Sequence, residues 1–379
     1  MRFEFATATR IVFGQGTVAT LPQIVRSFGS CPLVVTGAST QRVLPLISDL
    51  SAQIFSVPGE PTVELVREGA RLAQGADCDV VVSIGGGSAI DAGKAISAIA
   101  ANGGEPLDFL EVVGKGQSLL HPPLPFIAVP TTAGTGSEVT RNAVLGSSEH
   151  GVKASLRSPL MLPRIALVDP ELTLNLPAAI TASTGLDALT QLVEPYVSAR
   201  ANPMVDALCV DGIPRAARAL RRAVHNGSDR EARNDMSLVS LFGGLALANA
   251  GLGVVHGFAA PIGGMIEAPH GAVCAAVLPF GMSANIRALR SRAPEHDALR
   301  RYRDVARILT GAPDAKPEDG VDWVRVLCRD LGILSLGKLG VTAAEIPDLV
   351  AKAAKASSMK ANPIVLTPAE LTDILEQAL

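Results

Sequence analysis

Short apolar runs rich in β-branched residues recur along the first half of the chain, at residues 32–36, 53–57, 79–84, 125–129 and 164–168. After the second run, Val63, Val66 and Ala70 repeat at the spacing of one helical face. Strands that alternate with helices indicate crossover connections and a mostly parallel sheet. Because ligands of such sheets bind beyond the carboxyl ends of the strands, we expect binding residues to follow the strands.

The pattern changes after Pro177, where Ala- and Leu-rich stretches of helical length replace the β-branched runs. We therefore predict an α/β domain over residues 1–177 and an all-α domain over residues 178–379. Residues 164–177 would carry the last strand and the crossing between the two domains. The charged stretch 287–303 fits a solvent-exposed helical surface with a break at Pro294.

One segment of the second half, residues 236–266, contains no Asp, Glu, Lys or Arg and is long enough to span a membrane. However, Asn249, His256, Pro261 and seven glycines would place polar groups and helix breaks inside lipid, which cannot satisfy them. We therefore predict two consecutive helices that are buried in the helical domain.

Composition and charge exclude several classes of protein. The 379 residues suffice for two or three domains and a large core. Lys and Arg total 33 against 36 Asp and Glu, so the net charge of −3 provides no general attraction for nucleic acid or an anionic membrane. The five cysteines are scattered without a C-x-x-C pair, and no apolar run follows the N-terminal MRFEFATATR. We therefore expect a cytoplasmic protein without a secretory signal or membrane anchor.

A glycine-rich turn follows the predicted strand at 79–84. Gly85, Gly86 and Gly87 permit a close backbone approach, and the helix that starts beyond them offers unpaired N–H groups to a pyrophosphate. This arrangement would form a phosphate cradle. Ser88 and Asp91 also fit a helix N-cap with a capping-box variant, so a purely structural turn is the alternative explanation.

A second loop, residues 130–140, follows the predicted strand at 125–129 and is rich in small hydroxyl side chains. Thr131, Thr132, Thr135 and Ser137 provide donors and acceptors that the ribose and phosphates of a dinucleotide could use. A loop built on hydroxyl turns would explain the same residues without a ligand.

Candidate metal ligands lie in the helical half. Asp187 and Gln191 are four residues apart and therefore share one helical face, and His256 and His270 lie in a glycine-rich region further on. A carboxylate and two imidazoles can hold a divalent metal ion with a coordination position left open. The alternative for each histidine is a core residue with satisfied hydrogen bonds.

Six segments, in this order along the chain, resemble those of the iron-containing (group III) alcohol dehydrogenase family: GGGSAIDAGK at 85–94, PTTAGTGSEVT at 130–140, LVDPELTLNLP at 167–177, GLDALTQLVEPYVS at 185–198, VHGFAAPIG at 255–263 and PHGAVCAAVLP at 269–279. The resemblance covers nearly the whole chain. It implies an N-terminal dinucleotide-binding α/β domain, an all-α C-terminal domain and a cleft between them. The implied reaction is reversible hydride transfer between NAD or NADP and a small alcohol or aldehyde, and we expect a homodimer.

The resemblance assigns Asp187, His256 and His270 both catalytic and metal-binding roles. Family members usually bind iron or zinc through one Asp and three His, but the remaining ligand position is Gln191 here. A neutral amide is a poorer ligand, so we expect a weakly held metal with Gln191 as a weak or water-bridged ligand. A further histidine of the family faces the nicotinamide and is a candidate proton-relay group. Ala260 replaces it here, so this chain lacks that group.

Two mechanisms stay open on this resemblance. In one, the three remaining ligands hold a metal that lowers the pKa of the alcohol. In the other, the protein is a metal-independent reductase resembling maleylacetate reductase, in which other polar groups stabilise the oxyanion. A catalytically impaired, cofactor-binding paralogue is a further alternative. The dehydroquinate synthase family shares the architecture, but its site is richer in Lys and Arg than the helical-domain motifs of this chain.

The cofactor is NADP or NAD. Many family members have an Asp after the strand corresponding to 32–36, where it accepts the adenosine ribose 2′-hydroxyl, and this chain has Gly37. Without that carboxylate the repulsion of a 2′-phosphate is absent, and Ser39, Thr40 or Arg42 could bind one. The predicted cofactor-binding residues are Gly37, Ser39, Gly85, Gly86, Gly87, Ser88, Asp91, Thr131, Thr132, Thr135 and Ser137.

Overall fold

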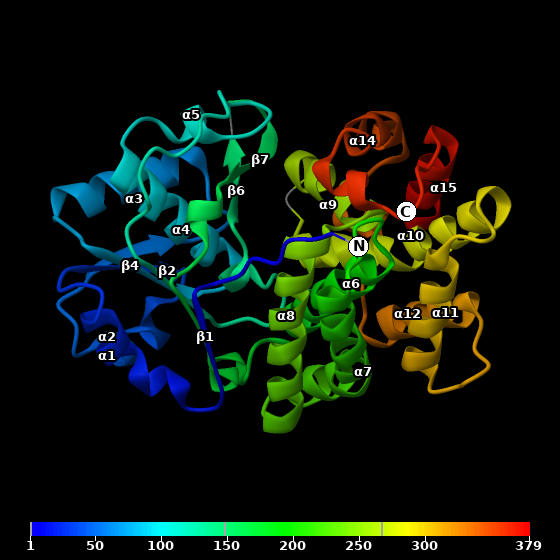
Figure 1. Cartoon of the computed structure of the whole chain (residues 1–379), viewed down its shortest axis with the longest axis horizontal. Helices are drawn as coiled ribbons and strands as arrows, with labels where there is room; N and C mark the ends of the chain where they lie inside the picture. Colours follow the sequence, from blue (N-terminus) through cyan, green and yellow to red (C-terminus); the bar gives the residue numbers. More distant parts are fainter. Residues whose placement is uncertain (1, 148, 267) are drawn as a thin grey trace. The chain divides into compact units, whose positions relative to one another are not determined.

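The computed structural model describes residues 2–147, 149–266 and 268–379 and divides into two compact units (Figure 1). One unit is Ala6–Leu174, and the other is Asn175–Leu379 together with the segment before Ala6. The division after Leu174 lies three residues before the predicted domain boundary at residue 177.

The first unit is built on a six-stranded sheet in which all neighbouring strands are parallel, with the order β1-β8-β5-β4-β2-β3. The strands are β1 (Arg10–Phe13), β2 (Pro32–Gly37), β3 (Gln53–Val57), β4 (Val80–Gly85), β5 (Phe126–Pro130) and β8 (Ile165–Val168). This confirms the predicted parallel sheet. All five predicted strands are present within one residue at each end, whereas β1 was not predicted.

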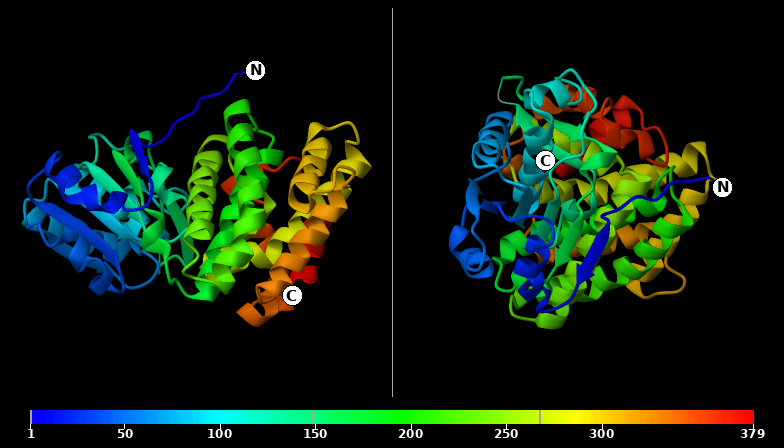
Figure 2. Two further views of the ribbon diagram at one scale, coloured as in Figure 1. Left: turned by 90° about the horizontal axis from the view of Figure 1, so that it is seen from below. Right: turned by 60° about the vertical axis from the view of Figure 1, so that its left-hand side comes forward.

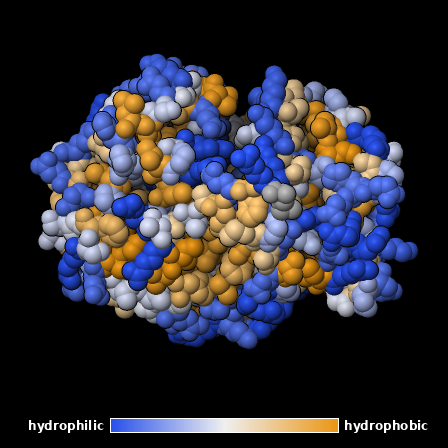
Figure 3. All heavy atoms as spheres, viewed as in Figure 1, coloured by the Kyte–Doolittle hydropathy of each residue, from blue (hydrophilic) through white to orange (hydrophobic). Residues whose placement is uncertain are grey.

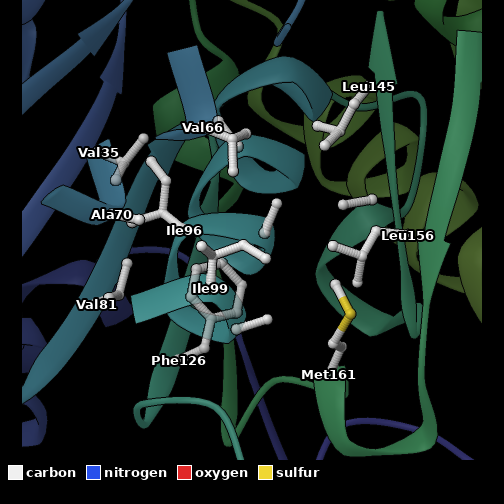
Figure 4. Close-up of a cluster of buried hydrophobic side chains, with 14 of the residues drawn as sticks. Val35, Val66, Ala70, Val81, Ile96, Ile99, Phe126, Leu145, Leu156 and Met161 are labelled. Carbon is white, nitrogen blue, oxygen red and sulfur yellow. The ribbon is translucent and has the colours of Figure 1, made fainter. Parts of the chain in front are cut away.

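Apolar side chains project from both faces of this sheet, and helices cover each face (Figure 2). The helices of this unit are α1 (Leu21–Arg26), α2 (Leu44–Ile47), α3 (Val63–Gly75), α4 (Gly87–Asn102) and α5 (Pro106–Phe109). Figure 4 shows one of the two cores, where Val66 of α3 and Ile96 of α4 face Val35 and Val81 of the sheet. Alternate residues of each strand point to opposite faces, so a sheet buried on both sides reads as continuous apolar runs.

A two-stranded antiparallel sheet, β6 (Asn142–Ser147) and β7 (Val152–Arg157), was not predicted. Leu145 and Leu156 of these strands turn inward and complete the core shown in Figure 4, while Val144 points outward. The hairpin therefore closes one side of α4. Short 3-10 helices complete the unit: η1 (Thr17–Thr20), η2 (Thr40–Arg42), η3 (Ser137–Val139), η4 (Pro159–Met161) and η5 (Pro170–Thr173).

The second unit contains helices and no strand among its described residues, which confirms the predicted all-α region. Its α-helices are α6 (Ala178–Val197), α7 (Pro203–His225), α8 (Arg230–Ala250), α9 (Val254–Met265), α10 (His270–Arg292), α11 (Asp297–Thr310), α12 (Pro317–Asp330), α13 (Leu336–Leu339), α14 (Ile346–Ala353) and α15 (Pro368–Ala378). The 3-10 helices are η6 (Ala343–Glu345) and η7 (Ser357–Ala361).

The uncharged segment forms two consecutive helices, as predicted, because α8 ends at Ala250 and α9 begins at Val254. Gly251 has a φ of 72°, a backbone conformation that favours glycine, and the two helix axes differ by 99°. Helix α10 is also long and apolar enough to cross a membrane, but 78% of its apolar window is buried within the protein. Packing between helices accounts for the apolar character of these segments.

The charged stretch forms the end of α10 and the start of α11, with the predicted break between Arg292 and Asp297. Arg300 and Arg301 form ion pairs with Asp297. The surface over α11 is mainly hydrophilic in the view of Figure 3. This stretch is therefore a solvated helical surface.

Candidate functional site

The glycine turn between β4 and α4 leaves no room for side chains. A Cβ atom on Gly85 would lie 2.6 Å from the Cβ of Ala89, and one on Gly87 would lie 2.8 Å from the Thr135 side chain. Gly86 is the N-cap of α4 and, having no side chain, makes no capping hydrogen bond to the N–H groups at this helix end. Since α4 begins before Ser88, the interpretation of Ser88 as the N-cap is wrong. The helix N-terminus is therefore free to bind an anion.

The predicted cofactor loops converge at the carboxyl edge of the sheet. The Thr131 N–H donates to the Gly85 carbonyl, at 2.9 Å, and the Thr132 side chain lies 3.3 Å from the position of a Cβ on Gly86. The backbone nitrogen of Gly37 lies 3.3 Å from the position that a Cβ on Gly85 would occupy. The ends of β2, β4 and β5 thus bring three separate stretches of sequence together. Ser39 follows β2 as an exposed residue that precedes η2.

Asp91 and Ser137 contact each other rather than standing open to solvent. The Ser137 hydroxyl donates to the Asp91 carboxylate, which also accepts from Val144 N–H at 2.9 Å. Lys94, fully buried, lies 3.3 Å from the same carboxylate and donates to the Ser137 carbonyl at 2.9 Å. Burial lowers the pKa of Lys94, and the charge of Asp91 opposes this shift. Lys94, which the sequence did not single out, holds the second loop against α4.

The candidate metal ligands converge from three helices. Asp187 lies on α6, His256 on α9, and His270 and Cys274 on α10, and one donor atom of each lies within 4.8 Å of the others. His256 Nε2 is 3.3 Å from Asp187 Oδ1, and His270 Nε2 is 4.0 Å from the same oxygen. Cys274 Sγ is 3.6 Å from His270 Nε2. These atoms surround one point at which a cation would be held.

Two of these donor atoms, Asp187 Oδ1 and His256 Nε2, are buried without a hydrogen-bond partner among the described residues. Buried polar atoms without a partner are costly, at about 1–3 kcal/mol each, and a metal ion would satisfy both of these at once. The residues present therefore fit the divalent metal that the sequence predicts.

A carboxylate behind His256 sets the direction of its imidazole. His256 Nδ1 lies 2.7 Å from Glu194 Oε2, and Glu194 Oε1 accepts from Val255 N–H at 2.8 Å. A proton on Nδ1 satisfies Glu194 and leaves the lone pair of Nε2 directed at the cluster. Glu194 follows Asp187 by seven residues on α6, so both side chains share a helical face.

Gln191 is oriented by Asp187. Its side-chain Nε2 donates to Asp187 Oδ2 at 3.1 Å, while its Oε1 is buried and has no partner within residues 2–147, 149–266 and 268–379. The amide thus presents its NH₂ group to the carboxylate, and an NH₂ group is no metal ligand. Sequence reasoning could name this position but not the direction of the amide.

The pKa directions describe a site that stabilises positive charge. Burial favours a raised pKa for Asp187, but the neighbouring imidazoles of His256 and His270 lower it overall. The neighbouring Cys274 raises the pKa of His270 to about 9, against the effect of burial. Burial also opposes protonation of His256, yet Cys274, Asp187 and Glu194 raise its pKa well above the usual value. Such a site favours cations.

Cys274 was missed from the sequence. It lies four residues after His270 on α10, and this spacing could have placed it on the ligand face. A cysteine in an apolar stretch, however, is most often a core residue.

Comparisons with known proteins place the chain in a family. Residues 8–170 match the family model for iron-containing alcohol dehydrogenase, and residues 181–379 match the model for the C-terminal part of the Fe-containing alcohol dehydrogenase family. Alcohol dehydrogenase 4 of Schizosaccharomyces pombe is 36% identical over 97% of this chain and 87% of its own. The NAD-dependent methanol dehydrogenase of Bacillus methanolicus is 32% identical over 97% of both chains.

A solved structure of 1,3-propanediol oxidoreductase superposes with a TM-score of 0.91 at 32% identity and covers 100% of both chains. Two matching family models, full-length relatives and a common fold lead to one assignment. The chain belongs to the iron-containing alcohol dehydrogenase family.

Proposed function

We propose that this protein transfers hydride reversibly between NAD or NADP and a small alcohol or aldehyde at a divalent metal held by Asp187, His256 and His270. The coarser assignment is an oxidoreductase of this family that acts on alcohols. The family is NAD-dependent and binds metal. The observation that carries the metal proposal is a pair of buried atoms, Asp187 Oδ1 and His256 Nε2, for which the described part of the chain offers no hydrogen-bond partner.

The residues of the chain would act as follows. When bound, the metal polarises a carbonyl oxygen or lowers the pKa of an alcohol. Asp187 supplies the negative charge, and Glu194 holds the proton on His256 Nδ1 so that Nε2 stays a ligand. Ala260, one helical turn after His256 and exposed, has no group that could relay a proton.

The cofactor would bind the first unit. The open N-terminus of α4 and the glycine turn suit a pyrophosphate, and Thr131, Thr132 and Thr135 stand beside it. A Cβ on Gly37 would meet nothing within 4 Å, so the position is open and carries no charge to repel a 2′-phosphate. These features support NADP at least as well as NAD.

The protein is predicted to be a cytoplasmic homodimer without nucleic-acid or membrane partners. All five cysteines are free thiols, in accord with a reducing compartment. The metal-independent reductase and the impaired paralogue are not favoured, because the relatives are named alcohol dehydrogenases and three ligand residues are retained.

Turnover before and after metal removal tests the proposal. The protein is stripped with a chelator without oxygen, reloaded with Fe²⁺ or Zn²⁺, and assayed with NAD and NADP on methanol, 1,3-propanediol, butanol and the corresponding aldehydes. We expect activity to follow metal content and to be lost in Asp187→Asn but not in Asp348→Asn, a surface control. Full activity in metal-free protein would refute the metal-dependent function.

A further inference from the structure

We propose that Cys274 is the fourth protein ligand of this metal ion and takes the coordination position that Gln191 does not fill. This inference rests on the proposed function, since it presumes that the cluster holds a metal. It changes the donor set from one carboxylate and three imidazoles to one carboxylate, two imidazoles and one thiolate.

The distances between the donor atoms fit such a site. Zinc binds nitrogen and oxygen at ~2.0 Å and sulfur at ~2.3 Å, so on a tetrahedron a nitrogen and a sulfur lie ~3.5 Å apart, and a nitrogen and an oxygen ~3.3 Å apart. Cys274 Sγ is 3.6 Å from His270 Nε2, and His256 Nε2 is 3.3 Å from Asp187 Oδ1. These two pairs are spaced as ligands of one ion, and all four donor atoms lie within 4.8 Å of one another. His270 Nε2, at 4.0 Å from Asp187 Oδ1, would move closer to that oxygen when an ion binds.

Gln191 is not spaced or oriented in this way. Its NH₂ group donates to Asp187 Oδ2, and its Oε1 lies beside α8, 3.2 Å from the position of a Cβ on Gly243. Turning the amide over would set Oε1 against Asp187 Oδ2, two acceptors face to face. Gln191 therefore acts on the ion through Asp187, as a positioning residue.

The thiolate is supported by its surroundings. Cys274 is fully buried, where an isolated thiolate would be costly, and the bound metal ion would supply the positive charge that stabilises it. On binding, the thiol releases its proton to solvent and the sulfur donates an electron pair to the ion, so nothing is oxidised or reduced. Asp187 and Cys274 together then neutralise a divalent ion.

This donor set carries a consequence for metal identity. Thiolates are soft ligands and favour zinc over ferrous iron, whereas carboxylate and imidazole alone do not discriminate as strongly. We therefore expect this member of an iron-containing family to prefer zinc.

Cobalt spectroscopy tests the assignment without relying on turnover. The full-length, chelator-stripped protein is titrated with Co²⁺ alone, and the near-ultraviolet thiolate-to-cobalt charge-transfer band is recorded. We expect the band in wild type and in Cys328→Ser, a half-buried cysteine on α12 that serves as the matched control. Cys274→Ser should lack the band and bind Co²⁺ more weakly. Loss of a residue that only hydrogen-bonds to a metal ligand lowers metal affinity by roughly 10- to 100-fold, and we expect the loss in Cys274→Ser to be larger.

The possible outcomes separate this inference from the function on which it rests. Cobalt bound to wild type without a thiolate band overturns the role of Cys274 and leaves the metal-dependent function standing. The same holds if the band persists in Cys274→Ser. Wild-type protein that binds no Co²⁺ overturns both. If Cys274→Ser does not fold, Cys274→Ala replaces it in the same titration, and a wild-type spectrum without the band still overturns the role of Cys274.

Discussion

Glu194 Oε2 lies 2.7 Å from His256 Nδ1, although the two residues are 62 positions apart in the chain. Both side chains are buried, so the hydrogen bond between them is shielded from water. The carboxylate fixes both the tautomer and the direction of an imidazole whose other nitrogen faces the metal cluster.

Glu194→Gln should therefore weaken metal binding without removing a ligand. An amide satisfies the Val255 N–H or the His256 Nδ1–H but lacks the charge that strengthens the imidazole as a donor. We expect the metal affinity, measured by competition with a chromophoric chelator, to fall by roughly 10- to 100-fold. Glu376→Gln, on the surface, should leave it unchanged. Equal affinities in all three proteins would contradict the role of Glu194.

The phosphate cradle makes a steric prediction at Gly86. Its φ of −77° and ψ of −173° are open to any residue, so a side chain is excluded by space rather than by the backbone. Gly86→Val should lower the affinity for NAD and NADP by about 100-fold or more, equivalent to about 2.8 kcal/mol, by filling the site of the pyrophosphate. Fluorescence titration measures this loss. Gly59→Val, at an exposed and uncrowded position, is the control. If folded Gly86→Val binds the cofactor normally, the glycine turn is not the phosphate-binding site.

Cofactor preference depends on charge at position 37. Wild type should bind NADP at least as tightly as NAD, and Gly37→Asp should move the preference toward NAD by repelling the 2′-phosphate. Gly37→Asn matches the new side chain in size without its charge and should shift the preference less. The position has room for either residue. A wild-type preference for NAD of about tenfold, or 1.4 kcal/mol, would contradict this argument.

Glu138 makes the stability of the protein depend on pH. The residue is buried on η3, and burial raises its pKa to about 7, against the charge of Lys94. The native protein thus keeps a proton that the unfolded chain, with the ordinary pKa of 4.5, has already released. Because the native state binds more protons between these values, its stability falls as pH rises from about 4.5 to about 7.

Glu138→Gln should remove this dependence. The free energy of unfolding is measured with urea at pH 5 and pH 8. Relative to wild type, the variant should be more stable at the higher pH by up to about 3 kcal/mol, because each pKa unit represents about 1.36 kcal/mol. Glu376→Gln, with an exposed side chain, should follow the wild-type profile. If Glu138→Gln runs parallel to wild type across this range, the carboxyl group is ionised in the native protein.

The sequence predicted the centre of the fold better than its margins. The five predicted strands are apolar throughout, since helices cover both faces of the sheet. Strand β1 has only four residues and lies at the sheet edge, so its signal is short. The hairpin alternates small residues such as Ala143 and Ala154 with polar ones, a weak pattern that only contact with α4 makes clear.

The site shows a similar division between local and distant information. Asp187, His256 and His270 were predicted from residue type and resemblance, and the structure brings them together. Glu194 and Cys274 were not, because each acquires its role only where α6, α9 and α10 meet. Glu194 shares a helical face with Asp187, and Cys274 shares one with His270, so helical spacing could have named both as candidate site residues. Spacing alone does not say which residue on such a face contacts the metal or one of its ligands.

Exchanging the fourth ligand between two positions tests the metal centre as a whole. Gln191→His restores the imidazole of the family pattern one turn from Asp187, so the double variant Gln191→His/Cys274→Ser should recover much of the metal affinity that Cys274→Ser loses. Its cobalt complex should lack the thiolate band, and its preference for zinc over ferrous iron should diminish, because an imidazole is harder than a thiolate. Metal analysis and chelator competition on all four proteins measure both effects. If Gln191→His raises affinity equally with and without Cys274, the two side chains do not compete for one coordination position, and the thiol lies outside the coordination shell.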